Sequence, residues 1–112
     1  MKYTVWYMKA DFFSNGIVGY DHLVEHSRLP DPKNLPQTHE VVTEFPDAPA
    51  SPDFLERIYI ALQDDWLPPK GEVVELIKKL GHTSMSVGDI VQYTDEAGTH
   101  TCMVDVIGFR EI

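Results

Sequence analysis

Hydrophobic positions follow two different spacings along this chain, and together they predict an α+β fold. Four segments have the composition and spacing of strands, and we expect strands at 2–9, 38–45, 87–93 and 99–107, although the alternation of apolar and polar residues is imperfect in the first. Both faces of the first segment are largely apolar, which is typical of an interior strand. Apolar residues recur every three or four positions in 52–66 and 71–80, which predicts two helices, and a weaker helical pattern covers 20–29.

Local signals give these elements their ends. Ser51 and Pro52 are typical of a helix start, and Gly81 is typical of a helix end. Asn15-Gly16 predicts a turn after the first strand, and Asp95-Glu96-Ala97-Gly98 predicts the turn of a hairpin. We therefore expect one domain over 1–112, with a mainly antiparallel sheet of about four strands and two or three helices packed on one face.

The charge of the chain excludes some classes of partner. Eighteen acidic against nine basic residues give a formal net charge of −9, which repels nucleic acid and anionic membranes. No apolar run approaches the length of a membrane span. The single cysteine, Cys102, rules out an internal disulfide and favours the reducing cytoplasm. A protein partner is therefore expected, with no direct binding of nucleic acid or membrane.

Positions 40 to 65 contain seven acidic residues and a single basic residue, Arg57. The acidic residues are Glu40, Glu44, Asp47, Asp53, Glu56, Asp64 and Asp65. Such a run usually forms a solvated face. It would alternatively imitate the phosphates of DNA and bind a protein that handles nucleic acid.

Polar side chains are concentrated between the second predicted helix and the hairpin. They include His82, Ser84, Ser86 and Asp89. Side chains this short commonly hydrogen-bond the backbone of a turn, and we expect that role here. The alternative is a small polar site for a ligand or a partner.

Two further motifs suggest chemistry but lack the rest of a site. His22 and His26 belong to a His-Leu-Val-Glu-His sequence, the spacing of inverted zinc proteases, yet no third ligand is evident. His100 and Cys102 fall on one face of a strand and could pair as base and nucleophile, although a free cysteine usually packs in a core. We predict no metal, no cofactor and no catalytic residue.

The C-terminal part resembles the YodL-like domains, which are small modules of bacterial plasmids, integrative elements and phages. The matching residues are His82, Ser84-Met85-Ser86-Val87-Gly88-Asp89-Ile90-Val91 and Gly108-Phe109, within roughly 66–112. The N-terminal segment and the Thr38-His39 pair are also similar to those of such proteins. The resemblance implies an accessory or anti-defence role in a mobile element, and no catalytic residue.

Together these observations predict a small acidic interaction protein of the cytoplasm that binds a host protein without catalysis. The alternative is a small enzyme or ligand-binding domain that uses the polar turn from His82 to Asp89 or the pair His22 and His26.

Overall fold

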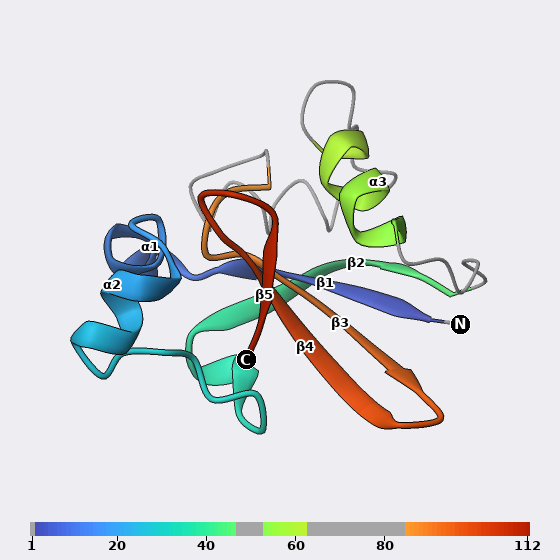
Figure 1. Cartoon of the computed structure of the whole chain (residues 1–112), viewed down its shortest axis with the longest axis horizontal. Coiled ribbons are helices and arrows are strands. Elements are labelled where there is room, and N and C mark those ends of the chain that lie inside the picture. The colour runs from blue at the N-terminus through green and yellow to red at the C-terminus, as the bar shows by residue number, and fades with distance from the viewer. Residues whose placement is uncertain (1, 47–52, 63–84) are drawn as a thin grey trace.

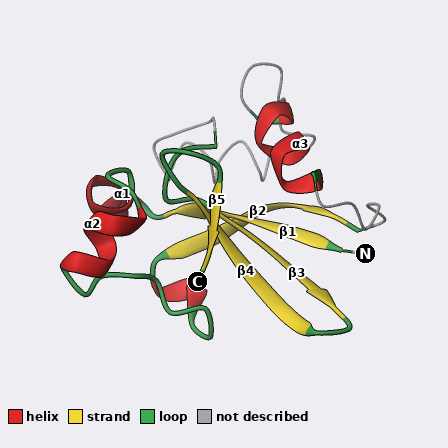
Figure 2. Ribbon diagram, in the orientation of Figure 1, coloured by secondary structure: helices red, strands yellow, loops and turns green. Residues whose placement is uncertain are grey.

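The computed structural model describes residues 2–46, 53–62 and 85–112, and these form an antiparallel sheet with helices around it (Figure 1, Figure 2). In chain order the elements are β1 (Tyr3–Met8), α1 (Ala10–Gly16), α2 (Tyr20–Glu25), the 3₁₀ helix η1 (Leu35–Gln37), β2 (His39–Phe45), α3 (Phe54–Ala61), β3 (Ile90–Asp95), β4 (Gly98–Val104) and β5 (Phe109–Glu111).

The strands lie in the order β2-β1-β3-β4-β5, and every neighbouring pair is antiparallel. The α+β class is confirmed, and so is the interior position of the first strand. The sheet has five strands in the described residues, not about four. The segment predicted as one strand over 99–107 ends as β4 at Val104, turns, and returns as the short β5.

The segment after β1 is helical, although Asn15-Gly16 suggests a simple turn. The amides of Phe12 and Phe13 donate to the carbonyl oxygen of Lys9 at 3.0 and 3.1 Å, which begins α1. The helix ends at Gly16. The Asn-Gly signal therefore falls at the end of a helix, where a Cβ added to Gly16 would clash with Met8 Sδ.

Two separate cores cover the two faces of the sheet. The first contains Tyr3, Val5, Tyr7, Val42, Ile58, Leu62, Met85, Val91 and Val104. The second contains Leu23, Leu35, Ile90 and Met103, with Trp6, Phe12, Tyr20 and Ile112 packed against it. Neighbouring residues of a strand point to opposite faces, so the two cores lie on opposite faces of the sheet. Ile58 of α3 belongs to the first core, whereas Leu23 of α2, Leu35 of η1 and Phe12 of α1 belong to or pack against the second. The helix α3 therefore covers one face, and α1, α2 and η1 cover the other. The prediction that the helices share one face is therefore wrong.

Several predicted elements match only in part. The helix predicted over 52–66 is α3, Phe54–Ala61, and the strand predicted over 87–93 is β3, Ile90–Asp95. The weak pattern over 20–29 contains α2. The helix predicted over 71–80, the end signal at Gly81 and the start signal at Ser51 and Pro52 lie outside the described residues.

A β-bulge interrupts β2 at Val42. Val5 is opposite Thr43 and Trp6 is opposite Val41, so Val42 is the extra residue of the pair of strands. An extra residue changes the alternation of faces. Side chains of β2 that a regular strand would place on one face therefore lie on opposite faces, before and after the bulge.

Gly88 precedes β3 at a point where three segments of backbone meet. Its φ is +99°, and a Cβ added there would lie 2.5 Å from Met8 Sδ and 2.8 Å from the carbonyl carbon and oxygen of Gly16. Two independent reasons therefore require glycine at position 88: the positive backbone angle φ and the lack of space for a Cβ.

We expect Gly88→Ala to destabilise the fold strongly. The matched control is Gly98→Ala: φ there is +122°, but nothing lies within 4 Å of the added Cβ, so it measures the backbone penalty alone. That penalty is roughly 1–2 kcal/mol. Overpacking at Gly88 adds roughly 1–3 kcal/mol. Urea unfolding should show this difference, and equal losses of unfolding free energy would contradict the tight packing.

Candidate functional site

The carboxylate of Asp89 is fully buried and hydrogen-bonds backbone amides from two segments. Oδ1 accepts from the Met8 amide at 2.8 Å, and Oδ2 accepts from the Ser86 amide at 2.7 Å. Burial raises the pKa of the Tyr7 phenol, and the negative charge of Asp89 raises it further. The predicted backbone role of Asp89 is thus confirmed, and its carboxylate lies in the interior rather than at a surface where it could meet a ligand.

The other residues of the predicted polar turn are placed as follows. The Ser86 carbonyl accepts from the Asp89 amide at 2.9 Å, which closes a tight turn before β3. Met85, from the same polar-looking run, is buried in the first core. His82 and Ser84 lie outside the described residues. In the described part, this segment is therefore an organised turn.

His39 is a buried polar residue that sequence reasoning did not single out as part of a site. Its Nε2 lies 2.8 Å from the Gly88 carbonyl oxygen, and its Nδ1 lies 2.7 Å from Thr38 Oγ1. A carbonyl oxygen only accepts, so Nε2 carries a proton and donates it. His39 thereby ties the start of β2 to the turn before β3. The only sequence signal was its place in the Thr38-His39 pair of the family resemblance.

The two histidines of the zinc-protease motif lie on α2 and just after it. The ring centroids of His22 and His26 are 4.3 Å apart, and the His22 side chain is half-buried whereas that of His26 is exposed. Among the described residues, no group of three or more His, Cys, Asp or Glu side chains is arranged to hold a metal ion.

His100 and Cys102 are engaged separately. Burial raises the pKa of the Cys102 thiol from 9.0 to about 11, and the negative charge of Glu111 adds to this effect. The two ring nitrogens of His100 contact carboxylates instead: Nε2 lies 2.9 Å from Asp95 Oδ1, and Nδ1 lies 3.1 Å from Glu111 Oε2. This arrangement gives neither a thiolate nor a free base.

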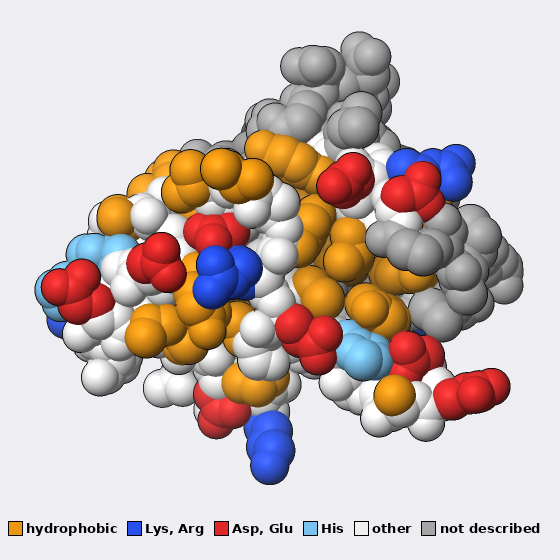
Figure 3. Space-filling view, in the orientation of Figure 1, with side chains coloured by type: hydrophobic (Ala, Val, Ile, Leu, Met, Phe, Trp, Pro, Cys, Tyr) orange, Lys and Arg blue, Asp and Glu red, His pale blue; other side chains and the backbone are white. Residues whose placement is uncertain are grey.

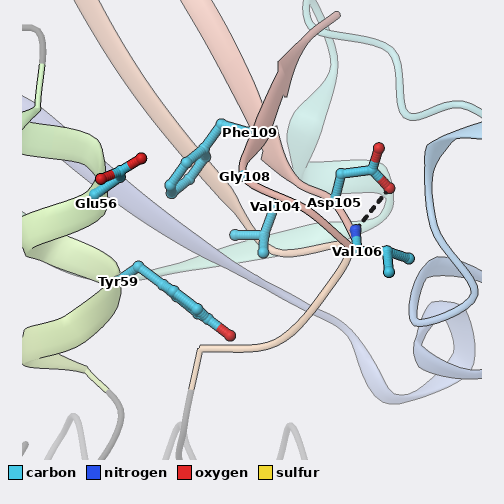
Figure 4. A pocket seen from close by; sticks show the side chains of 7 residues that line it. All are labelled: Glu56, Tyr59, Val104, Asp105, Val106, Gly108 and Phe109. Atoms are coloured by element: carbon cyan, nitrogen blue, oxygen red, sulfur yellow. Dashed lines mark hydrogen bonds between the residues drawn. The ribbon is translucent and has the colours of Figure 1, made fainter.

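A hollow of about 260 Å³ lies between α3 and the β4–β5 hairpin (Figure 4). It is lined by Glu56, Tyr59, Val104, Asp105, Val106, Gly108 and Phe109. The Tyr59 and Phe109 rings meet edge to face across it, with centroids 6.5 Å apart. Aromatic and aliphatic walls with one exposed carboxylate, that of Glu56, suit an apolar side chain of a partner.

The turn beside the hollow exposes two aliphatic residues. The Asp105 amide donates to the Gly108 carbonyl at 2.8 Å, which closes a four-residue turn with Val106 and Ile107 at its tip. These side chains are 72% and 89% exposed. Turn tips are usually polar or glycine, so two exposed β-branched residues require an explanation.

The carboxylate of Asp105 fixes this turn against the helices on the other side. Its Oδ1 accepts from the Tyr20 amide at 3.1 Å and from the Val106 amide at 2.8 Å. Arg110 Nη1 lies 3.6 Å from Oδ2, and its guanidinium lies 4.2 Å from the centroid of the Tyr20 ring. The residues at the base of the turn are therefore held in place by these contacts, while its tip is exposed.

Two more exposed aliphatic residues belong to the chain segment that approaches this tip. Ile17 and Val18 connect α1 to α2, and a Cβ added to the following Gly19 would lie 3.3 Å from Val106 Cγ2. We call these four residues the turn patch: Ile17, Val18, Val106 and Ile107. Figure 3 shows hydrophobic side chains grouped over this face, with acidic side chains between and beside them.

The predicted acidic set is divided by the fold. Glu40 is opposite Tyr7, on the α3 face, whereas Glu44 is opposite Thr4 on the other face, because the β-bulge lies between them. Glu44 also lies 3.3 Å from Lys2 Nζ. Two further members, Asp53 and Glu56, are exposed at the start of α3. Asp47, Asp64 and Asp65 lie outside the described residues. The described members thus do not form one track along a single face.

No family model matches the chain, and neither the curated proteins nor the solved structures contain a match. The resemblance to the YodL-like domains therefore stays a prediction. Among the described residues, no helix is both long enough and apolar enough to cross a membrane.

We expect Asp89→Ala to lower the free energy of unfolding by about 2–4 kcal/mol, because two buried amides lose a charged acceptor. The unfolding temperature should fall by roughly 8 °C or more. Asp21→Ala removes an exposed carboxylate from α2 and should change stability by no more than about 0.5 kcal/mol. Thermal unfolding followed by circular dichroism compares the two variants, and similar small shifts would contradict a structural role for Asp89.

His100 should give the stability a pH dependence near neutrality. Hydrogen bonds to Asp95 and Glu111 raise its pKa above 6.5, so the folded state binds the proton more tightly than the unfolded state. The resulting stabilisation is complete below pH 6.5 and is lost as the pH rises through the raised pKa. The difference in unfolding temperature between the wild type and His100→Gln should therefore be larger at pH 5.5 than at pH 8.5. An imidazole titration by NMR with a midpoint at or below 6.5 would contradict this.

Proposed function

We propose that this protein is a binding module without catalytic activity, and that its partner is another protein held at the turn patch and the adjacent hollow. The observation that carries the proposal is the exposure of Val106 and Ile107, 72% and 89%, at the tip of an anchored turn. Exposed apolar groups next to an apolar hollow are typical of a surface that becomes buried on association.

Charge supports a partner with a basic surface. The chain carries a net charge of −9, and Glu56 is exposed at the rim of the hollow. Complementary charge speeds association and disfavours partners of the same sign. A basic protein with one or more exposed apolar side chains therefore fits this surface better than an acidic one.

The setting of the proposal comes from the sequence. The free cysteine Cys102 favours the cytoplasm, and the resemblance to YodL-like domains favours an accessory or anti-defence factor of a mobile element. The proposed partner is then a protein of the bacterial host. Proteins that handle nucleic acid are one class with the required basic surface.

The test is affinity capture from a bacterial lysate with three baits. The wild type is compared with Val106→Ser/Ile107→Ser and with Val24→Ser/Val41→Ser, which removes two exposed valines outside the turn patch and the hollow. A partner should be retained equally by the wild type and the control, and at least about tenfold less by the turn variant, since loss of about 1.4 kcal/mol reduces affinity tenfold. Equal retention by all three baits would refute the proposal.

A further inference from the structure

β5 is the outermost strand on its side of the sheet within the described residues. The Asp105 amide donates to the Gly108 carbonyl and the Ile112 amide donates to the Thr101 carbonyl, both at 2.8 Å. In antiparallel pairing, the residues bonded to the neighbouring strand recur at every second position. Position 110 of β5 therefore faces β4, and the backbone N–H and C=O groups of the flanking positions 109 and 111 point outward from the sheet.

This open edge borders the hollow. Phe109 belongs to β5 and also lines the hollow together with Tyr59 of α3 (Figure 4). A strand laid along β5 would direct every second side chain toward the α3 face of the sheet. One such side chain would therefore reach the apolar hollow while the backbone pairs with the edge.

The edge is also held in place from its other face. Arg110 contacts the Asp105 carboxylate and the Tyr20 ring, so β5 is anchored by the one residue that faces β4. Glu111 additionally contacts His100 through its side chain. These contacts leave the outward backbone groups of positions 109 and 111 in a fixed arrangement before any partner arrives, which reduces the entropy lost on binding.

We propose that β5 accepts an extended segment of a basic partner as a sixth strand. The segment places an aliphatic side chain in the hollow and a lysine or arginine beside Glu56. This inference rests on the proposed function and specifies how the partner is held. Strand addition of this kind takes affinity from main-chain hydrogen bonds and specificity from side-chain pockets.

The opposite edge of the sheet suits this role less well. β2 is longer, but its bulge at Val42 disturbs the regular spacing of backbone groups that a new strand would need. β5 offers only two outward residues, so the hydrogen bonds alone give weak binding. The hollow and the Glu56 carboxylate at its rim must supply the rest of the binding energy, so the choice of partner depends on side chains.

The probe is an acetylated and amidated octapeptide of alternating lysine and valine, with its glutamate–valine counterpart as control. We expect saturating lysine–valine peptide to slow amide hydrogen exchange of Phe109 and Glu111 at least tenfold in NMR spectra of the full chain. The glutamate–valine peptide should leave these rates unchanged. Equal slowing by both peptides, or none with millimolar lysine–valine peptide, would overturn the inference.

Two variants at position 111 separate the contribution of the backbone N–H to peptide binding from that of the side chain. Glu111→Pro removes an outward N–H, and Glu111→Ala keeps it, while both lose the carboxylate. Proline is tolerated where an edge N–H faces outward. The proline variant should bind the lysine–valine peptide at least tenfold more weakly than the alanine variant. Equal affinities would overturn strand addition, and if Val106→Ser/Ile107→Ser still abolished capture of the protein partner, the proposed function would stand without it.

Discussion

The buried carboxylate of Asp89 is the constraint on which the rest of this fold depends. The carboxylate accepts hydrogen bonds from the Met8 amide at the end of β1 and from the Ser86 amide in the turn before β3. The backbone carbonyl oxygen of Asp89 accepts a third hydrogen bond, from the Val104 amide at 2.8 Å. A carboxylate this deep costs several kcal/mol unless it is satisfied by donors. The neighbouring Gly88 carbonyl is held by His39 of β2. Four strands thus meet at two consecutive residues, and a shift of any one of them would leave buried polar groups unpaired.

The contacts around Gly88 and Asp89 also determine the position of the surface that we propose as the binding site for a partner. The end of β4 is fixed at Val104, so the chain must reverse in the four residues that follow. Asp105 anchors that reversal to the Tyr20 amide, and the tip that remains, Val106 and Ile107, is pushed into solvent. Asp89 and Ser86, the described residues of the predicted polar site, therefore hold the backbone of this junction together. Val106 and Ile107, which the sequence analysis placed at the end of a predicted strand, are instead exposed at a turn.

Helices cover both faces of the sheet. In the described part of the chain, a partner strand can therefore form backbone hydrogen bonds with the sheet only at its edges. One core lies under α3 and the other under α1, α2 and η1. A row of rings crosses the α3 face from Phe45 of β2 to His100 of β4. Phe45 and Tyr3 both contact Phe54, Tyr3 contacts Tyr93, and Tyr93 stacks on His100 at 4.8 Å. The row ends at the carboxylates of Asp95 and Glu111. A partner that approaches β5 therefore meets acidic groups along one side and apolar walls on the other.

The sequence by itself determined what depends on neighbouring residues. Alternation specified β1, β2 and the hairpin, apolar spacing specified α3, and a short acidic side chain before a strand indicated that Asp89 would bond to backbone. Tertiary structure decided what depends on distant ones. Three residues after a tight turn carry too little pattern to predict β5, and the bulge at Val42 that separates Glu40 from Glu44 is visible only against β1. Tyr59 and Phe109 line one hollow from elements far apart in the chain. Local preferences fix each element, but only long-range packing decides which faces are buried and which edge stays open.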